Sequence, residues 1–304
     1  MEVISQFQRP IIPITDLKCT VGCPILDGFL RGGIPCGMIT ELAGESTASK
    51  TQMCLQLLLT VQWPKSHGGL EGSSLYIYTE GEPPMRRLQE LAAHHPQLNC
   101  SSRSAFDNIF VERDIANWED LDQCLERAER LLQQPPGLPL RLIVIDSIAH
   151  IYRDAADFGS GQGRDGYAER TAQLFRMAGL LKKYADMYKI AVVVTNQVMD
   201  AVGATVGPDP ASLHSGGLKL MSSGREVIPA LGPSWACCVN LRIFLSRLTA
   251  ADLQYVPQQQ QQGASGEAQQ TRCMQVVFSS YLPQKYCYYT VGQQGIRGLG
   301  ALHS

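Results

Sequence analysis

Short apolar segments alternate with amphipathic segments along most of the chain. The apolar segments, which fit strands buried on both faces of a parallel sheet, are residues 39–43, 74–79, 109–111, 142–145 and 190–195. The segments with apolar residues every three or four positions, the spacing of helices, are residues 51–62, 84–92, 118–132 and 170–188. This alternation predicts an α/β fold: a twisted, mainly parallel sheet with helices on both faces and right-handed crossovers.

The last third of the chain has a different pattern. Residues 239–245, 273–278 and 287–291 are strand candidates with little helix between them, and we expect them to form an antiparallel C-terminal edge of the sheet. Residues 203–224 are rich in Gly, Ser, Asp and Pro, which is typical of a long loop.

The two remaining segments mark the domain organisation. Residues 1–19 are interrupted by prolines and predict a linker or docking arm, so residues 20–304 would form one domain. Within it, residues 254–270 contain five consecutive glutamines, which is typical of a low-complexity insertion.

A phosphate-binding loop follows the first apolar segment. Residues 44–51 read G-E-S-T-A-S-K-T, one residue away from the pattern G-x-x-x-x-G-K-[ST] of a loop that cradles phosphates with its backbone N–H groups. The cofactor-binding candidates in it are Gly44, Glu45, Ser46, Thr47, Ala48, Ser49, Lys50 and Thr51. Lys50 would reach the β/γ-phosphates, and the Thr51 hydroxyl would hold Mg²⁺. Because Ser49 replaces the second glycine, the sequence predicts nucleotide binding but leaves hydrolysis open.

Three polar residues follow other predicted strands, where ligands bind in such sheets. Asp146 ends the segment 142–145 and would help Thr51 to hold Mg²⁺, although it could also cap the next helix. Glu80 follows the segment 74–79 and could act as a general base toward water, or be a solvated strand-end residue. Gln197 could sense the γ-phosphate, because an amide can change hydrogen-bond partners.

Composition narrows the class of protein. The chain has 304 residues, 44% hydrophobic and 18% charged, with a net charge of −2. No apolar run approaches the ~20 residues of a membrane span, and the N-terminus lacks a secretory layout, so a soluble intracellular protein with reduced cysteines is expected. The absence of a basic surplus argues against a strong autonomous DNA binder.

The motifs together resemble the RecA-type recombinases of eukaryotes. The resemblance covers the chain from about residue 20, through T-V-G-C-P-I-L-D-G-F-L-R-G-G, the phosphate loop, T-E-G, L-I-V-I-D-S and V-V-V-T-N-Q-V. Within that group the chain is most similar to an accessory paralogue in a short, plant-like form. The motifs shared with that form are H-G-G-L-E at residues 67–71, S-G-R at 223–225 and P-A-L-G-x-x-W-A at 229–236.

The resemblance implies two DNA-facing loops, one after Asp146 and one at about residues 200–233. The cations that would contact phosphates there are Arg153, Arg164, Arg170, Lys219 and Arg225. For each arginine, a solvated surface position or an intramolecular ion pair is about equally expected.

The chain also departs from the resembled family. Ser49 loses the access of glycine to positive φ, and residues 278–283 have serine where an acid would complete a neighbour's nucleotide site. The N-terminal helical domain is absent, and Phe7-x-x-Pro10 is a poor match to the Phe-x-x-Ala docking element. These differences argue against a self-sufficient filament.

The resemblance therefore implies an ATP- and Mg²⁺-binding accessory recombinase paralogue with at most weak DNA-dependent ATPase activity. It would act in the nucleus, and also the cytoplasm, in homologous recombination, meiosis and double-strand break repair. Its expected partners are another paralogue, the main strand-exchange recombinase and single-stranded or branched DNA. The alternatives are a self-polymerising recombinase, a nucleotide-independent scaffold and, more distantly, a small-molecule kinase.

Overall fold

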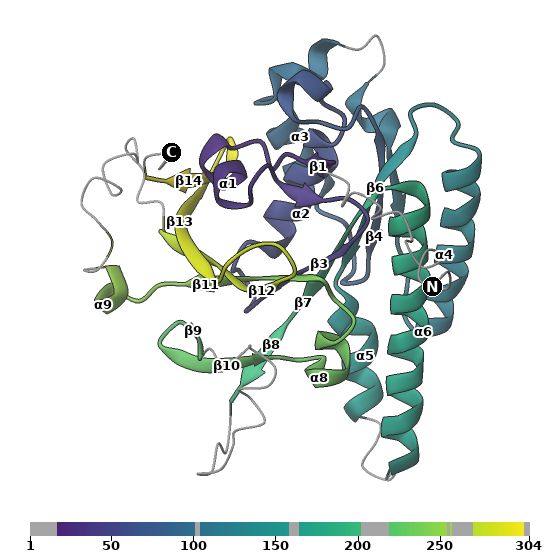
Figure 1. Ribbon diagram of the computed structural model, residues 1–304, viewed down its shortest axis with the longest axis vertical. Helices are drawn as coiled ribbons and strands as arrows, with labels where there is room; N and C mark the ends of the chain where they lie inside the picture. The colour runs from purple at the N-terminus through teal and green to yellow at the C-terminus, as the bar shows by residue number, and fades with distance from the viewer. Residues whose placement is uncertain are drawn as a thin grey trace, which may run out of the picture.

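A nine-stranded twisted sheet forms the centre of the computed structural model, which describes residues 17–100, 104–157, 164–201, 219–253, 256 and 270–300 (Figure 1). Its strands lie in the order β14-β13-β12-β11-β3-β7-β6-β4-β5. The parallel strands are β3 (Ile39–Gly44), β4 (Ser73–Tyr78), β5 (Ile109–Glu112), β6 (Leu140–Asp146), β7 (Ala191–Asn196) and β11 (Leu241–Arg247). The antiparallel edge is formed by β12 (Arg272–Ser279), β13 (Lys285–Gly292) and β14 (Gly295–Leu299). The predicted fold class is confirmed, but the expectation that residues 239–245 belong to the antiparallel edge is wrong: they form β11, which runs parallel to its neighbour β3, and the antiparallel edge begins at β12.

Helices cover both faces of the sheet, because alternate residues of each central strand face opposite sides. In β6, Leu142 and Val144 join the core under α1 (Pro24–Phe29), α2 (Lys50–Thr60) and α3 (Met85–Ala92). Ile143 and Ile145 join the core under α4 (Trp118–Gln133), α5 (Ile148–Asp157), α6 (Arg164–Tyr188) and α8 (Gly232–Ala236). The remaining described helices are α9 (Ala250–Leu253) and the 3₁₀ turns Lys65–His67, Pro96–Cys100 and Ala105–Asn108.

Local signals account for the ends of several helices. Asn117 caps α4, because its side chain accepts a hydrogen bond from the backbone N–H of Asp120 at 2.8 Å. Helix α2 begins directly at the end of the phosphate loop, and most of its residues are buried, as expected for a helix that packs in the middle of the fold. The predicted helix 84–92 is observed from Met85 to Ala92.

Two small sheets were not predicted. Strand β1 (Lys18–Cys19) pairs with β2 (Ile34–Pro35), so the end of the expected N-terminal arm is a strand. Strands β8 (Val198–Asp200), β9 (Leu220–Ser222) and β10 (Arg225–Pro229) form the second small sheet. The prediction that residues 203–224 form a loop is therefore wrong at β9, where Leu220 packs with Val227 and Phe244.

Other predictions fall outside the described residues. These are residues 1–16, including Phe7 and Pro10, most of the expected loop 203–224, and the glutamine-rich segment apart from Val256 and Gln270. Within the described part of the chain, none of the helices has the length and apolar character that crossing a membrane requires.

A buried ion pair lies beneath the phosphate loop, where β3, β7 and β11 meet. Glu41 of β3 and Arg242 of β11 are register partners, both fully buried, and the guanidinium donates to the carboxylate. Asn196 of β7 donates a second hydrogen bond to Glu41 at 2.7 Å. These contacts fix the strand that leads into the loop relative to its two neighbours.

Candidate functional site

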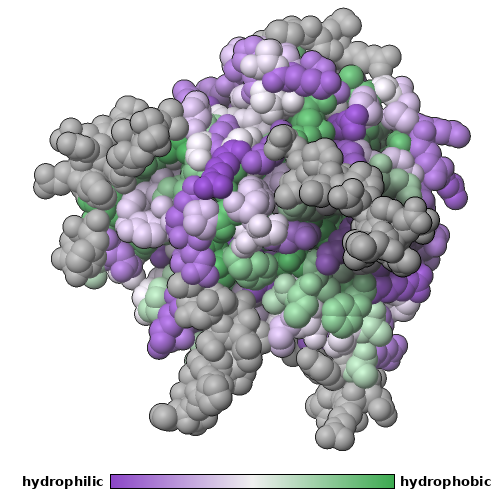
Figure 2. Space-filling model, viewed as in Figure 1, coloured by the Kyte–Doolittle hydropathy of each residue, from purple (hydrophilic) through white to green (hydrophobic). Residues whose placement is uncertain are grey.

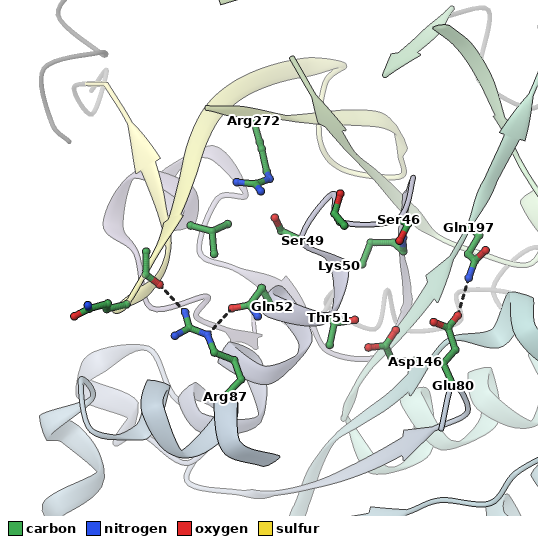
Figure 3. Close-up of a pocket in the computed structure, with 14 residues that line it drawn as sticks. Ser46, Ser49, Lys50, Thr51, Gln52, Glu80, Arg87, Asp146, Gln197 and Arg272 are labelled. Carbon is green, nitrogen blue, oxygen red and sulfur yellow. Dashed lines mark hydrogen bonds between the residues drawn. The ribbon is translucent and has the colours of Figure 1, made fainter. Parts of the chain in front are cut away.

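The carboxyl ends of β3, β4, β6 and β7 meet around a cavity of about 550 Å³ (Figure 3). Most of the residues predicted for the site line it: Ser46, Thr47, Ser49, Lys50, Thr51, Glu80, Asp146 and Gln197. They come together because parallel strands place the residues that follow them at one edge of the sheet. Gly44, Glu45 and Ala48 complete the loop that forms one wall.

The loop adopts a backbone that favours glycine at two non-glycine positions. Thr47 has φ 65° and Ser49 has φ 78°, both in the left-handed region. The expectation that Ser49 loses access to positive φ is therefore wrong for this chain. At Gly44, by contrast, a Cβ would lie 2.4 Å from the backbone oxygen of Leu245, so only glycine fits.

Lys50 lies folded back over the loop. Its ammonium group donates to the backbone oxygens of Gly44 at 2.7 Å and Glu45 at 2.9 Å. Burial lowers the pKa of Lys50, and the carboxylates of Asp146 and Glu80 oppose that effect. The charge of Lys50 is thus held between the loop and the two strand-end acids.

Asp146 is almost completely buried and is held by hydroxyl groups. Thr195 donates to its Oδ1 at 2.6 Å, and Tyr76 donates to its Oδ2 at 3.3 Å. Burial raises the pKa of Asp146 above its ordinary value, against these hydroxyl groups, the nearby Thr51 side chain and the charge of Lys50. The two residues predicted to hold Mg²⁺, Thr51 and Asp146, both line the cavity and lie near each other (Figure 3).

Glu80 and Gln197 also contact each other. The Gln197 amide donates to Glu80 Oε1 at 2.7 Å, and the Ser147 hydroxyl donates to the same oxygen at 2.7 Å (Figure 3). Glu80 is exposed to solvent at the cavity. The site thus places a carboxylate that can accept a proton beside an amide that can change partners.

Sequence reasoning missed two arginines of the cavity, Arg87 and Arg272. Arg87 of α3 donates to Gln52 Oε1 at 3.0 Å and to the backbone oxygen of Gly292 at 2.5 Å (Figure 3). Arg272 begins β12, and its Nε is buried with no hydrogen-bond partner among the residues that the structure describes. No local pattern marks either residue, because both reach the cavity through contacts between distant segments.

Glu45 connects the loop to the β9–β10 hairpin. Its carboxylate accepts hydrogen bonds from the hydroxyls of Ser222 at 2.7 Å and Ser223 at 2.5 Å, and Arg225 lies 3.3 Å away. Burial raises the pKa of Glu45, but the two serine hydrogen bonds and the charges of Arg247 and Arg225 outweigh that effect and leave the pKa below its ordinary value.

The cations predicted to contact DNA differ in their ion pairs and in the elements that carry them. Arg225 pairs with Asp200 at 2.8 Å as well as with Glu45, and Lys219 pairs with Glu226 at 3.3 Å. Arg153 and Arg164 lie in α5 and α6, so the prediction that they stand on a flexible loop is wrong for these two positions, whereas Arg170 lies in α6 as the predicted helix 170–188 implies. The reason is the apolar spacing of residues 148–152, which extends the helical cover of the sheet beyond Asp146.

Ser279, one of the two serines in the stretch 278–283 where an interfacial acid was expected to be missing, has a local role. The hydroxyl oxygen of Ser279 accepts hydrogen bonds from the backbone N–H groups of Tyr281 at 3.1 Å and Leu282 at 3.0 Å. It therefore holds the turn between β12 and β13. Its short side chain carries no charge to offer a neighbouring molecule.

The residues of the cavity fit a nucleoside triphosphate with Mg²⁺. The loop is a concave wall that a side chain at Gly44 would disrupt, and Lys50, Arg87 and Arg272 supply positive charge. Among the described residues there is no cluster of three or more His, Cys, Asp or Glu side chains that could hold a metal ion. Mg²⁺ bound through one carboxylate, one hydroxyl and substrate phosphates does not need such a cluster.

Comparison with known proteins agrees with this architecture. Residues 14–221 match the Rad51 family. The chain is 38% identical to the DNA repair protein XRCC3 homolog of Arabidopsis thaliana, over 93% of each chain. It is 34% identical to the DNA repair protein XRCC3 of Bos taurus, over 96% of this chain and 78% of the relative. It is also 34% identical to the DNA repair protein RAD51 homolog 2 of Mus musculus, over 73% of this chain and 64% of the relative. The chain therefore belongs to the Rad51 family of RecA-like proteins.

Proposed function

We propose that this chain is an ATP-binding recombinase paralogue that acts in DNA repair and homologous recombination. The observation that carries the nucleotide site is the meeting of Lys50, Thr51 and Asp146 in one cavity beside a loop with phosphate-binding geometry. The similarity to relatives named as DNA repair proteins supports the cellular role.

Each residue of the loop has a defined task in this proposal. The backbone N–H groups of residues 46–51 and the ammonium group of Lys50 bind the phosphates. Thr51 and Asp146 would hold Mg²⁺, and the ion would supply positive charge to neutralise the phosphates. Two of the three N–H donors of Lys50 are engaged by the carbonyl oxygens of Gly44 and Glu45, so a phosphate would accept from the third donor or displace these two bonds.

Glu80 and Gln197 would act on the terminal phosphate. Glu80 is placed to orient a water molecule and accept its proton, while Gln197 holds the carboxylate through its amide. Gln197 directly precedes β8, which pairs with β10 of the hairpin that contacts Glu45. If Gln197 changed its hydrogen-bond partner, the resulting movement could therefore be transmitted through β8 to that hairpin and to the predicted DNA-facing segment.

The proposed mode of action is assistance to another recombinase. Ser279 is engaged in its own turn and brings no acid to a neighbour's site. Arg225 and Lys219 are engaged in intramolecular ion pairs, and the net charge is −2. These features support a protein that pairs with another paralogue and shares its contacts with single-stranded or branched DNA. That role places it in the nucleus.

Two alternatives give different results in solution. A self-polymerising recombinase would form filaments as a pure chain and hydrolyse ATP faster when DNA is added. A nucleotide-independent scaffold would show no thermal stabilisation by nucleotide, because a ligand that binds the folded state must raise its stability.

The decisive experiment measures binding of ATP and ADP with Mg²⁺ to the chain alone and together with a paralogue partner. We expect thermal stabilisation and saturable binding, and their loss in Lys50→Ala. Lys65→Ala is a matched control, since Lys65 is an exposed lysine that pairs with Glu71 at 3.7 Å, away from the cavity. Equal nucleotide binding by the native chain and Lys50→Ala would refute the proposed site.

A further inference from the structure

A tyrosine from the antiparallel edge of the sheet reaches the phosphate loop. Tyr289 of β13 is fully buried, and its hydroxyl donates to the backbone oxygen of Ala48 at 2.8 Å. This bond fixes the peptide unit that joins Ala48 to Ser49. One phenol group thus anchors the loop from a position 241 residues later in the chain.

The position that Tyr289 holds is the unusual one of the loop. Ser49 has φ 78° and is mostly buried at the start of α2. A side chain with a Cβ is strained in this left-handed conformation, whereas glycine adopts it freely. Something other than the intrinsic preference of residue 49 must therefore keep the loop in a phosphate-binding shape.

The sheet register brings Tyr289 to this place. Tyr289 lies opposite Arg272 of β12, and Arg272 lines the nucleotide cavity above Ser49 (Figure 3). Further along β13, Val291 and Gly292 line the same cavity. The β12–β13 pair is thus a rigid support beside the loop rather than only the edge of the sheet.

We propose that Tyr289 is a positioning residue that compensates for the serine at position 49. Its hydroxyl fixes the carbonyl oxygen of Ala48, which belongs to the peptide unit that joins Ala48 to Ser49, and so keeps the N–H groups of the loop directed toward the phosphates. This inference rests on the proposed nucleotide site and names the residue that makes the site compatible with serine.

The test is a double-mutant cycle on the full chain, with ADP and Mg²⁺ as the probe. Tyr289→Phe should weaken ADP binding about fivefold in the native chain, as expected for one net hydrogen bond. In the Ser49→Gly background the same change should weaken binding less than twofold, because glycine needs no support. Ser49→Ala, which keeps the Cβ but lacks the hydroxyl, should bind ADP as the native chain does and should retain the full effect of Tyr289→Phe.

Tyr184→Phe serves as the control. Tyr184 is also fully buried, and its hydroxyl donates to the backbone oxygen of Leu125 at 3.1 Å on the other face of the sheet. It should lower the melting temperature without changing ADP binding. A Tyr289→Phe effect of equal size in the native chain and in the Ser49→Gly background would mean a general structural role and would overturn the proposal, as would no effect at all.

Hydrogen exchange tests the inference separately from nucleotide binding. Without nucleotide, Tyr289→Phe should speed amide exchange in the peptide covering residues 45–52 when Ser49 is present, and not in the Ser49→Gly background. If the native chain fails to bind ADP, the proposed function fails, and this measurement still decides whether Tyr289 supports the loop. Unchanged exchange in Tyr289→Phe with Ser49 would refute the positioning role.

Discussion

The buried pair Glu41–Arg242 gives the sharpest stability prediction. Both side chains are fully buried, and each is supported by a further neighbour: Asn196 donates to Glu41, and the ring of Phe278 lies 5.0 Å from the Arg242 guanidinium. Arg242→Met removes the cation and leaves the carboxylate of Glu41 buried without its charged partner. Removal of one member of such a pair costs about 3–5 kcal/mol. This is a large part of a typical unfolding free energy of about 5–15 kcal/mol.

The double variant Glu41→Met/Arg242→Met should be more stable than Arg242→Met alone. It leaves no buried charge, and its remaining cost is the Asn196 amide that loses its acceptor, about 1–3 kcal/mol. Double replacement of a buried pair by apolar residues is often neutral for this reason. The two substitutions should therefore couple strongly instead of adding.

Urea denaturation followed by circular dichroism measures these differences as shifts of the unfolding midpoint. A suitable control is Lys183→Met, because Lys183 forms a half-exposed pair with Glu129 at 3.1 Å and should cost less than about 1 kcal/mol. If Arg242→Met costs no more than this control, or if the two single effects simply add in the double variant, the reasoning about buried charge is wrong.

Three further predictions concern the cavity and its surroundings. Ser49→Gly removes about 1 kcal/mol of left-handed strain and should raise single-turnover ATP hydrolysis; an unchanged rate would mean that a partner's group limits the reaction instead. Arg272→Gln should weaken ADP binding severalfold, most at low salt, while leaving adenosine binding unchanged if Arg272 contacts phosphate; equal losses for both ligands would contradict a phosphate contact. Burial and the charge of Arg297 lower the pKa of His95 to about 4, so the unfolded chain binds a proton that the folded chain excludes. The free energy of unfolding should therefore fall by up to about 3 kcal/mol as the pH drops from about 6.5 toward 4, and His95→Phe should show a flatter pH dependence in urea titrations at pH 7 and pH 5.

Much of the candidate site could be predicted because it is built from strand ends. The loop at residues 44–51 has a local pattern, and Glu80, Asp146 and Gln197 each follow an apolar segment. In a parallel sheet these positions share one edge, so the order of elements along the chain is enough to place them together. The antiparallel edge was likewise indicated by strands with little helix between them.

Helix and hairpin boundaries next to the predicted loops were harder to predict. Residues 148–157 follow the strand-end Asp146 and were expected to form a loop, yet they form α5 because Ile148 and Tyr152 have a place in the core. Strand β9 is too short for a periodic signal, and it forms because β10 is available to pair with it. In both cases the surrounding fold decides the conformation, and local composition does not.

The distribution of apolar and hydrophilic residues on the molecular surface also depends partly on local sequence pattern and partly on tertiary structure. Hydrophilic and apolar residues are interspersed over the face in Figure 2, whereas most of the described residues buried in the core are apolar. The periodicity of each helix predicts which of its faces is covered. Which side chains of distant segments then meet at the surface depends on the order of the strands in the sheet.

The amino-acid sequence alone determined the fold class, the phosphate loop and the set of strand-end residues, because these depend on local pattern and on chain order. Only the tertiary structure brought Tyr289 of β13 to the carbonyl oxygen of Ala48, beside Ser49, through a contact that no spacing along the chain encodes. It also decided that Arg225 pairs with Glu45 and Asp200, and that Arg272 enters the cavity. Such contacts depend on which strands become neighbours in the sheet, so a residue's partner is settled only when the whole sheet has formed.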